Sequence, residues 1–198
     1  MGKYIIGVDQ STQGTKALLF DDMGDLVCRA DRAHRQLVNE KGWVSHSPEE
    51  IYENFILVIK EVIEKASISP AQVVGLGISN QRETSVIWDR YTGKSLCDAI
   101  VWQCARAAEI CERKEIEAKA ELLVQKTGLK LSPYFPAAKI AWLLENVKDG
   151  KKKSVLHSVC YGTMDSYLVY KLTKGRVYAT DYLRIVKVFL RSQSPYRL

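Results

Sequence analysis

The sequence lacks long apolar runs and has few of the residues that build disulfide or metal sites. No stretch approaches the roughly 18 consecutive apolar residues that a membrane helix needs. The five cysteines are an odd number without a Cys-x-x-Cys pair, and there are only three histidines. A disulfide framework and a metal site built from cysteine and histidine are therefore not expected. The first residues run straight into a strand-like pattern without a signal-peptide core, so we expect a cytoplasmic protein without membrane contacts.

Basic residues are in excess, but they gather at one end of the chain. The formal net charge is +6. Residues 183–198 contain four of the basic side chains and no acid, so the first 182 residues carry only two of these six positive charges. The sequence has no stripe of basic residues interleaved with aromatic ones of the kind that nucleic-acid-binding surfaces use. We expect no nucleic-acid partner.

The pattern of apolar residues predicts an α/β domain. We expect strands at 4–9, 15–20, 25–33, 73–79, 84–88 and 99–102, and helices at 47–63, 104–126, 136–147 and 163–172. The continuous apolar run at 73–79 suits a central parallel strand. Cys104 and Cys111 are seven residues apart and should share a buried helix face, whereas Lys151–Lys153 should form a solvated turn. Three hairpin strands, a helix and a buried strand fit a mixed sheet flanked by helices.

The first candidate site is the segment G-V-D-Q-S-T-Q-G-T-K at 7–16. Asp9 ends a strand, and the small hydroxyl and glycine residues after it form a tight turn. Such a turn directs backbone N–H groups and the hydroxyls of Ser11, Thr12 and Thr15 at one point, which suits phosphate oxygens. A carboxylate at its edge can hold Mg²⁺, and Lys16 adds positive charge. A plain hairpin with a polar turn has the same sequence pattern.

The second candidate site is Asn80-Gln81-Arg82-Glu83-Thr84, which follows the apolar run at 73–79. Loops at the carboxyl ends of sheet strands are where α/β proteins bind ligands. Arg82 and Glu83 offer donors and an acceptor side by side, which suits the hydroxyls of a vicinal diol. A surface ion pair of little energetic weight is the alternative.

Two aromatic residues could complete a polyol site. Trp102 lies at a strand-to-helix junction, and Tyr134 precedes the helix expected at 136–147. Their rings could cover the carbon face of a small polyol, although ordinary core packing explains most such aromatics. We hypothesise that the turn at 9–16 and the pair at 82–83 face each other across one groove.

Several ordered strings resemble the FGGY carbohydrate kinases, over residues 4–182. They are D-Q-S-T-x-x-T-K-A-L-L-F-D near the start, G-W-V-S-H-S-P-E-E-I-Y at 42–52, G-I-S-N-Q-R-E-T at 77–84, A-I-V-W-Q-C at 99–104, T-G-L and P-Y-F within 127–135, and G-T-M-D-S-Y-L at 162–168. N-Q-R-E-T and V-W-Q-C are most similar to the glycerol kinase branch. The resemblance implies an actin, hexokinase and ribonuclease H type of fold.

The resemblance also implies roles for individual residues. Asp9 matches the magnesium-associated aspartate, and Lys16 stands where a basic residue lies near the nucleotide phosphates. The phosphate-contacting hairpin and the glycerol site are matched by Ser11, Thr12, Gln13, Gly14 and Thr15, and by Arg82, Glu83, Trp102 and Tyr134. In the family a polyol hydroxyl attacks the γ-phosphate of ATP with Mg²⁺ present, and a second aspartate accepts its proton. The full-length form could be a homo-oligomer.

Two departures from the family pattern limit these expectations. Residues 135–139 read F-P-A-A-K where glycerol kinases resemble F-S-G-T-K, so another polyol or a xylulose-like ketose remains a possible acceptor. From residue 183 the sequence diverges into a basic tail, and the chain is less than half the usual family length. We therefore expect an incomplete FGGY amino-terminal domain at 1–182 and a divergent tail at 183–198, from a truncated or frame-shifted reading frame. The base aspartate and the adenosine-binding domain would be missing, so the chain alone should have negligible kinase activity, or be a non-catalytic remnant.

Overall fold

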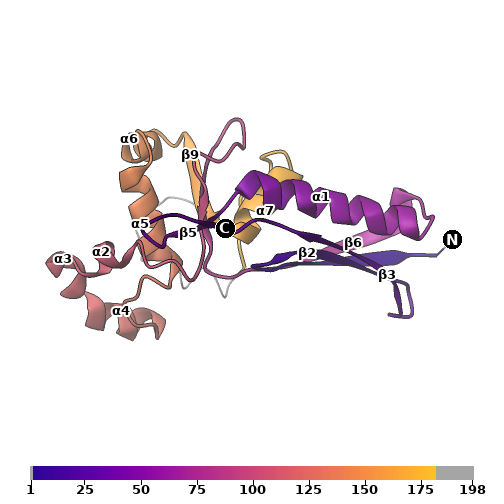
Figure 1. Cartoon of the computed structure of the whole chain (residues 1–198), viewed down its shortest axis with the longest axis horizontal. Coiled ribbons are helices and arrows are strands. Elements are labelled where there is room, and N and C mark those ends of the chain that lie inside the picture. The colour runs from indigo at the N-terminus through magenta and orange to yellow at the C-terminus, as the bar shows by residue number, and fades with distance from the viewer. Residues whose placement is uncertain (1, 182–198) are drawn as a thin grey trace. The chain divides into compact units, whose positions relative to one another are not determined.

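The computed structural model describes residues 2–181 (Figure 1). They form two compact units. The first unit comprises the residues up to 37 together with 46–82, and the second comprises 38–45 together with the residues from 83 onward. The proposed boundary between 182 and 183, and the basic tail, lie outside the described residues.

The first unit is built on a four-stranded mixed sheet in the order β3-β2-β1-β6. Its strands are β1 (Tyr4–Gln10), β2 (Gly14–Phe20), β3 (Leu26–Ala33) and β6 (Val73–Asn80). The first three are antiparallel neighbours, and β6 runs parallel to β1. The strands predicted from the sequence are confirmed here. However, β6 is an edge strand in the described sheet and not a central one, and its Val74 and Leu76 side chains are 59% and 42% exposed.

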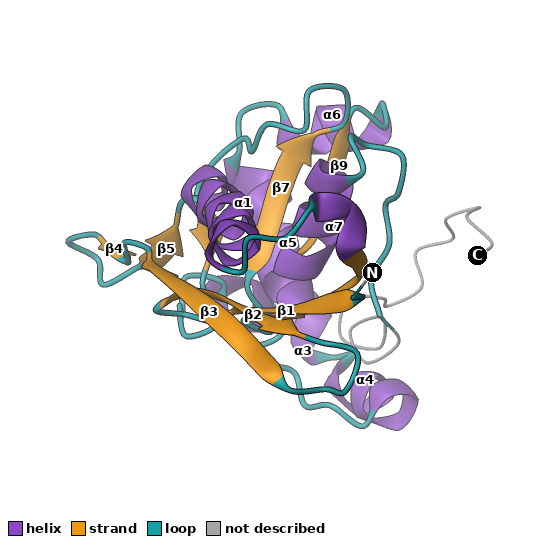
Figure 2. Ribbon diagram, turned by 90° about the vertical axis from the view of Figure 1, so that its right-hand side faces the viewer, coloured by secondary structure: helices purple, strands orange, loops and turns teal. Residues whose placement is uncertain are grey.

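Helix α1 (Pro48–Lys65) covers one face of this sheet (Figure 2). It begins as the sequence predicts, because the Ser47 hydroxyl accepts a hydrogen bond from the Glu50 amide and Pro48 occupies the first helical position. Apolar residues at helical spacing, including Ile51, Phe55 and Val58, are fully buried. The short 3-10 helix η1 (Pro70–Gln72) then leads into β6.

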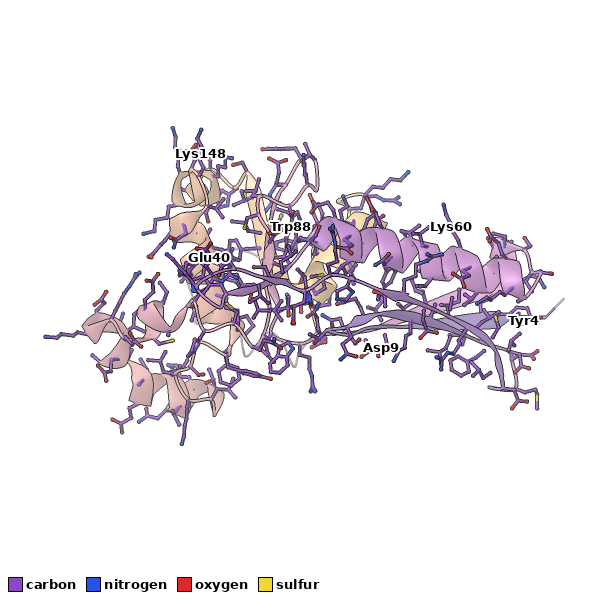
Figure 3. All side chains as sticks on the ribbon, in the orientation of Figure 1. Tyr4, Asp9, Glu40, Lys60, Trp88 and Lys148 are labelled. Atoms are coloured by element: carbon purple, nitrogen blue, oxygen red, sulfur yellow. The ribbon has the colours of Figure 1, made fainter. Side chains whose placement is uncertain are left out.

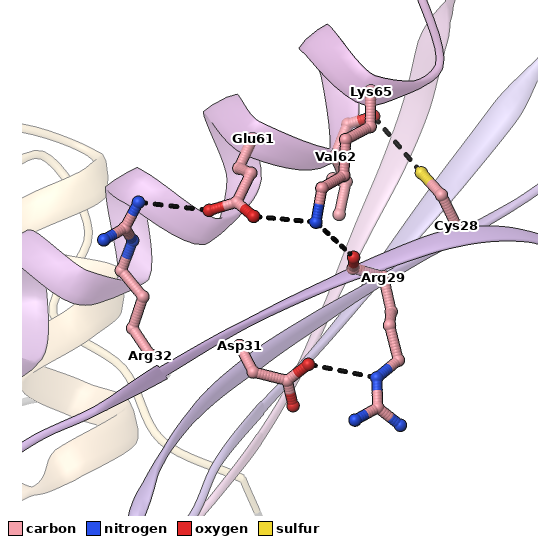
Figure 4. A network of polar contacts seen from close by, with 7 residues as sticks. All are labelled: Cys28, Arg29, Asp31, Arg32, Glu61, Val62 and Lys65. Atoms are coloured by element: carbon pink, nitrogen blue, oxygen red, sulfur yellow. Dashed lines mark hydrogen bonds and ion pairs between the residues drawn. The ribbon is translucent and has the colours of Figure 1, made fainter.

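Polar contacts fix α1 to β3 (Figure 4). The Glu61 carboxylate lies 3.1 Å from the Arg32 guanidinium and 2.8 Å from the Lys65 ammonium. Lys65 also donates to the Arg29 carbonyl, and the Cys28 thiol donates to a carbonyl of α1. Solvent-exposed pairs of this kind each contribute little to stability. Their effect is to hold the helix in one register along the strand.

The second unit has its own sheet, in the order β4-β5-β8-β7-β9. Its strands are β4 (Leu37–Val38), β5 (Val44–His46), β8 (Ala99–Ile100), β7 (Ser85–Asp89) and β9 (Val159–Thr163). Strand β7 is antiparallel to both β8 and β9. The strands predicted near 84–88 and 99–102 exist, but they belong to this second sheet, and β9 was not predicted.

Helices surround this second sheet. They are α2 (Ala108–Cys111), α3 (Lys114–Glu117), α4 (Ala120–Thr127), α5 (Pro136–Asn146), α6 (Gly150–Val155) and α7 (Met164–Leu172). Leu143 of α5 packs against Ile87 and Ile100 of the sheet, which gives the unit its apolar core. No helix within residues 2–181 is long and apolar enough to cross a membrane.

Three sequence predictions about helices are wrong. The single helix at 104–126 is three short helices; the break between α2 and α3 lies at Arg113, which adopts an extended backbone and whose guanidinium binds the Glu145 carboxylate at 2.9 and 2.6 Å. Cys104 precedes α2, so it does not share a helix with Cys111. Residues 151–153 lie in α6 and not in a turn.

Candidate functional site

The turn between β1 and β2 is closed by its own hydrogen bonds. The Ser11 amide and hydroxyl both donate to the Gly14 carbonyl, at 2.8 and 3.0 Å. The Gln10 side chain donates to the Ser11 carbonyl at 2.7 Å. The Ser11 hydroxyl therefore shapes the turn, and its oxygen can still accept a hydrogen bond.

Cross-strand pairing places the polar residues of this hairpin on two opposite faces. Asp9 pairs with Lys16, whereas Gln10 pairs with Thr15. Gln10 and Thr15 are fully buried, on the same face as the core residues of β1 and β2. Asp9 and Lys16 lie on the other face, where Asp9 is half-buried and Lys16 is exposed. A carboxylate and an ammonium thus stand side by side at this end of the sheet.

Gly14 is required by close packing against β3. A Cβ atom at this position would lie 2.5 Å from the Arg32 carbonyl oxygen and 3.2 Å from the Ala33 Cα. Such a contact forces the strands apart. The hairpin predicted as a phosphate loop is therefore held against β3 by a glycine that no larger residue can replace without movement.

The loop after β6 lies beside the end of β1. In the parallel pairing, Asp9 is opposite Ser79 and Gln10 is opposite Asn80. The Gln81 amide then donates to the Gln10 carbonyl at 2.6 Å, which extends the contact beyond the last paired residues. Figure 3 shows Asp9 and Tyr4 at opposite ends of β1, so the predicted residues gather at the carboxyl end of the strand. The exposed Arg82 follows directly from this point.

The second unit brings together the other predicted residues. Glu83 is buried and adopts a left-handed backbone with φ of 65°. A non-glycine residue in this region costs about 1–3 kcal/mol, a strain that is common at ligand sites. The next residue, Thr84, accepts a hydrogen bond from the Trp102 amide through its hydroxyl at 3.3 Å. This bond ties the segment that carries Glu83 to the segment that carries Trp102.

Trp102 and Tyr134 form an aromatic pair on the surface of this unit. Their ring centroids are 6.2 Å apart in an edge-to-face arrangement. The two residues are 36% and 44% exposed, so they are not ordinary core aromatics. Half-exposed rings of this kind can pack on an apolar ligand surface.

The predicted site residues therefore form two groups. Asp9, the turn at 11–16 and Arg82 belong to the first unit, and Glu83, Trp102 and Tyr134 belong to the second. Each group is compact within its own unit. That the two groups face each other across one groove stays a prediction.

Comparison with known proteins gives the family of this chain. The profile of the "FGGY family of carbohydrate kinases, N-terminal domain" matches residues 4–189. The chain belongs to the FGGY family. Glycerol kinase 1 of Thermotoga maritima is 43% identical over 187 residues, which are 94% of this chain and 38% of that protein. The chain thus spans about two fifths of the length of the curated relatives that it matches.

Solved structures agree with this assignment. A crystal structure of Plasmodium falciparum glycerol kinase with ADP superposes with a TM-score of 0.85 and 35% identity, over 94% of this chain and 37% of that one. Xylulose kinase from Lactobacillus acidophilus, at 21% identity and a TM-score of 0.71, shares the fold over 95% of this chain and 40% of its own. The actin- and hexokinase-like fold expected from the sequence is confirmed for this FGGY chain.

A buried histidine pair behind the hairpin was not predicted. The rings of His34 and His46 meet edge to face with centroids 4.6 Å apart. The His34 amide donates to the Gln13 carbonyl of the turn, and His46 Nδ1 lies 3.1 Å from the Gln81 side-chain nitrogen. These contacts link the hairpin to the loop after β6. The histidines are twelve residues apart, His34 just after β3 and His46 at the end of β5, so no sequence spacing marks them as a pair.

Burial determines the protonation state of this pair. It lowers the pKa of His46 to about 4, an effect that His34 reinforces and Glu50 opposes. Burial also lowers the pKa of His34. Glu50 in turn lies within 3.5 Å of Arg35. Both rings are therefore neutral at pH 7.

We predict that acid destabilises the FGGY chain through His46. Between pH 6.5 and about 4 the unfolded chain binds a proton that the folded chain does not, so stability falls as the pH falls. The loss should reach roughly 3 kcal/mol from this group. Urea unfolding at pH 7 and pH 4.5 measures it. In His46→Asn the free energy of unfolding should differ less between pH 7 and pH 4.5 than in wild type. His157→Asn, which replaces an exposed histidine, should behave as wild type. An unchanged difference in His46→Asn would contradict the assignment.

Proposed function

We propose that this chain forms the phosphate-binding and polyol-binding part of an ATP-dependent carbohydrate kinase that acts on glycerol. One observation carries the proposal. Asp9, near the carboxyl end of β1, and the loop with Arg82, which follows β6, lie at the same end of two neighbouring parallel strands. This is where α/β proteins bind ligands. The identity to glycerol kinases over nearly the whole chain supports the choice of substrate class.

The hairpin at 9–16 supplies the groups for the nucleotide phosphates. Backbone amides of the turn and the Lys16 ammonium would bind phosphate oxygens. Asp9 is half-buried beside Ser79, and a carboxylate with neighbouring hydroxyls fits Mg²⁺, which takes one or two protein ligands and otherwise phosphate oxygens and water. Residues 2–181 contain no group of three or more His, Cys, Asp or Glu that could hold a metal ion. When bound, Mg²⁺ would neutralise the charge of the phosphates.

The loop at 82–83 and the aromatic pair supply the groups for the polyol. The exposed Arg82 guanidinium would donate to substrate hydroxyl oxygens, and the Glu83 carboxylate would accept from the hydroxyl hydrogens. Trp102 and Tyr134 would pack on the carbon chain. These residues would hold the polyol and orient its hydroxyls, and such positioning accounts for most of the catalysis in phosphoryl transfer.

The difference from the glycerol kinase pattern at 135–139 leaves a second class of phosphate acceptor to be tested. Pro136 is the first residue of α5, a position that suits proline. Pro136 and Ala138 are buried, Ala138 against Ala107 and Ile110, and Ala137 is half-buried, so two of the three differing residues lie in the core. Glycerol therefore remains the first candidate, and a xylulose-like ketose or another polyol is the alternative. A homo-oligomer of the full-length form is likewise a proposal.

Glycerol binding tests the polyol site. We predict that Arg82→Ala weakens binding by roughly ten- to a hundredfold, because a hydrogen bond to a charged group contributes about 1.5–3 kcal/mol. Calorimetric or NMR titration with glycerol measures the change, and Arg29→Ala, which removes another exposed arginine of the first unit, should bind as wild type. Equal binding by Arg82→Ala would reject the assignment, and tighter binding of xylulose would favour the alternative acceptor.

Turnover is a separate question. We predict no measurable phosphorylation of glycerol by the 198-residue chain alone, because phosphoryl transfer needs the nucleotide to be enclosed and aligned, and proximity effects are worth roughly 7–11 kcal/mol. A coupled ATP assay over a panel of polyols measures this. Turnover on glycerol by the purified chain would show that these residues suffice for the whole reaction.

A further inference from the structure

Lys139 is a cation in an unfavourable place. It is the fourth residue of α5, and its side chain is fully buried. The positive end of the helix dipole disfavours a cation in this part of a helix. Lysine is almost never fully buried unless its charge has a partner. Neither helix stability nor apolar packing therefore explains a lysine here.

The Lys139 ammonium interacts with two residues of the proposed polyol site. Its Nζ donates to the Tyr134 carbonyl and lies 5.8 Å from the centroid of the Tyr134 ring. The charge of Glu83 stabilises the ammonium. The Tyr134 ring in turn contacts Trp102. Lys139 therefore contacts the aromatic part of the site directly, and the charge of Glu83, its acidic part, acts on the ammonium.

Other titratable groups also act on Lys139. Burial lowers its pKa to about 8, and the charges of Glu83, Cys104 and Cys111 act in the opposite direction. The Cys104 sulfur accepts from Arg106 Nε at 3.1 Å. Burial raises the pKa of the Cys104 thiol, but the contacts with Arg106 outweigh burial and leave that pKa below its usual value. The pKa values of the amine and of this thiol are therefore both lower than usual.

We propose that Lys139 is a positioning residue of the acceptor site, whose ammonium holds the Glu83 carboxylate and the Tyr134 segment in the arrangement that receives a polyol. This inference rests on the proposed function for the identity of the ligand, a polyol. The contacts themselves exist without a ligand. Loss of the charge, by mutation or at alkaline pH, should release the Tyr134 segment and move its ring relative to Trp102.

The ligand-free test follows the Trp102 environment. The chain has four tryptophans, so labelling with 5-fluorotryptophan gives few ¹⁹F signals, and Trp102→Phe identifies the one from Trp102. In wild type this signal should shift with a midpoint near pH 8. In Lys139→Met it should already stand at its alkaline position and not titrate, whereas Lys139→Arg should keep the neutral-pH position up to pH 9.5. Lys126→Met, which removes an exposed lysine, should titrate as wild type.

Cys104→Ala separates the amine from the thiol. The titration of the Trp102 signal should persist in this variant if Lys139 causes it. A signal that does not move with pH in wild type, that titrates unchanged in Lys139→Met, or that stops titrating in Cys104→Ala would overturn the inference. If a substitution unfolds the chain, the pH titration of the Trp102 signal in wild type still tests the proposal, because it needs no variant other than the one used for assignment.

Glycerol titration links the inference to the proposed function. Glycerol affinity should fall at least tenfold in Lys139→Met and decline above pH 8 in wild type, and Lys139→Arg should not show this alkaline decline. If wild type binds no glycerol at any pH, the proposed polyol function of this chain fails, and the ¹⁹F titration alone then decides whether Lys139 positions the segment. If glycerol binds equally well to wild type and Lys139→Met, the positioning role fails and the polyol site stands.

Discussion

The parallel pairing of β1 with β6 is the interaction on which the site in the first unit depends. A hairpin alone would present Asp9 and Lys16 to solvent with nothing beside them. Because β6 runs in the same direction as β1, Asn80, Gln81 and Arg82 lie at the same end of the sheet as Asp9. The backbone hydrogen bond from Gln81 to Gln10 then fixes the distance between turn and loop. Charge, hydroxyl and amide groups are thereby placed together before any ligand arrives.

In both units, buried titratable side chains lie directly behind the residues proposed to touch ligands. The His34–His46 pair links the hairpin to the loop in the first unit, and Lys139 binds the Tyr134 carbonyl and is proposed to hold Glu83 in the second. Such groups are costly to bury, so each must be held by specific partners. Ligand-contacting residues that lie on loops gain a defined geometry from these partners.

Most of the correctly predicted elements follow from local sequence patterns, and the elements that were missed depend on contacts between residues far apart in the sequence. The hairpin strands, the capped start of α1 and the turn at 9–16 follow from alternation, from Ser47-Pro48 and from short-range hydrogen bonding, so the sequence predicts them well. The apolar run at 73–79 predicted a strand buried on both faces. Burial of a strand depends on the elements packed beside it, and in the described sheet β6 has a strand on one side only. The expected helix at 104–126 is interrupted at Arg113, and the sequence does not show this because the partner of Arg113, Glu145, is thirty-two residues away. For the same reason Lys139 could not be assigned a role from its sequence context.

The account depends on binding of the nucleotide phosphates at the carboxyl end of β1, and paramagnetic NMR tests this most directly. Mn²⁺ added with ATP to the ¹⁵N-labelled chain should broaden the backbone amide signals of residues 9–16 and 80–82, relative to Mg²⁺ with ATP. Signals of Tyr4 and Val73, at the other end of the same strands and roughly 20 Å away, should broaden least, and Asp9→Asn should weaken the effect. Broadening centred on Tyr4 and Val73, or none at saturating Mn²⁺ and ATP, would contradict the account.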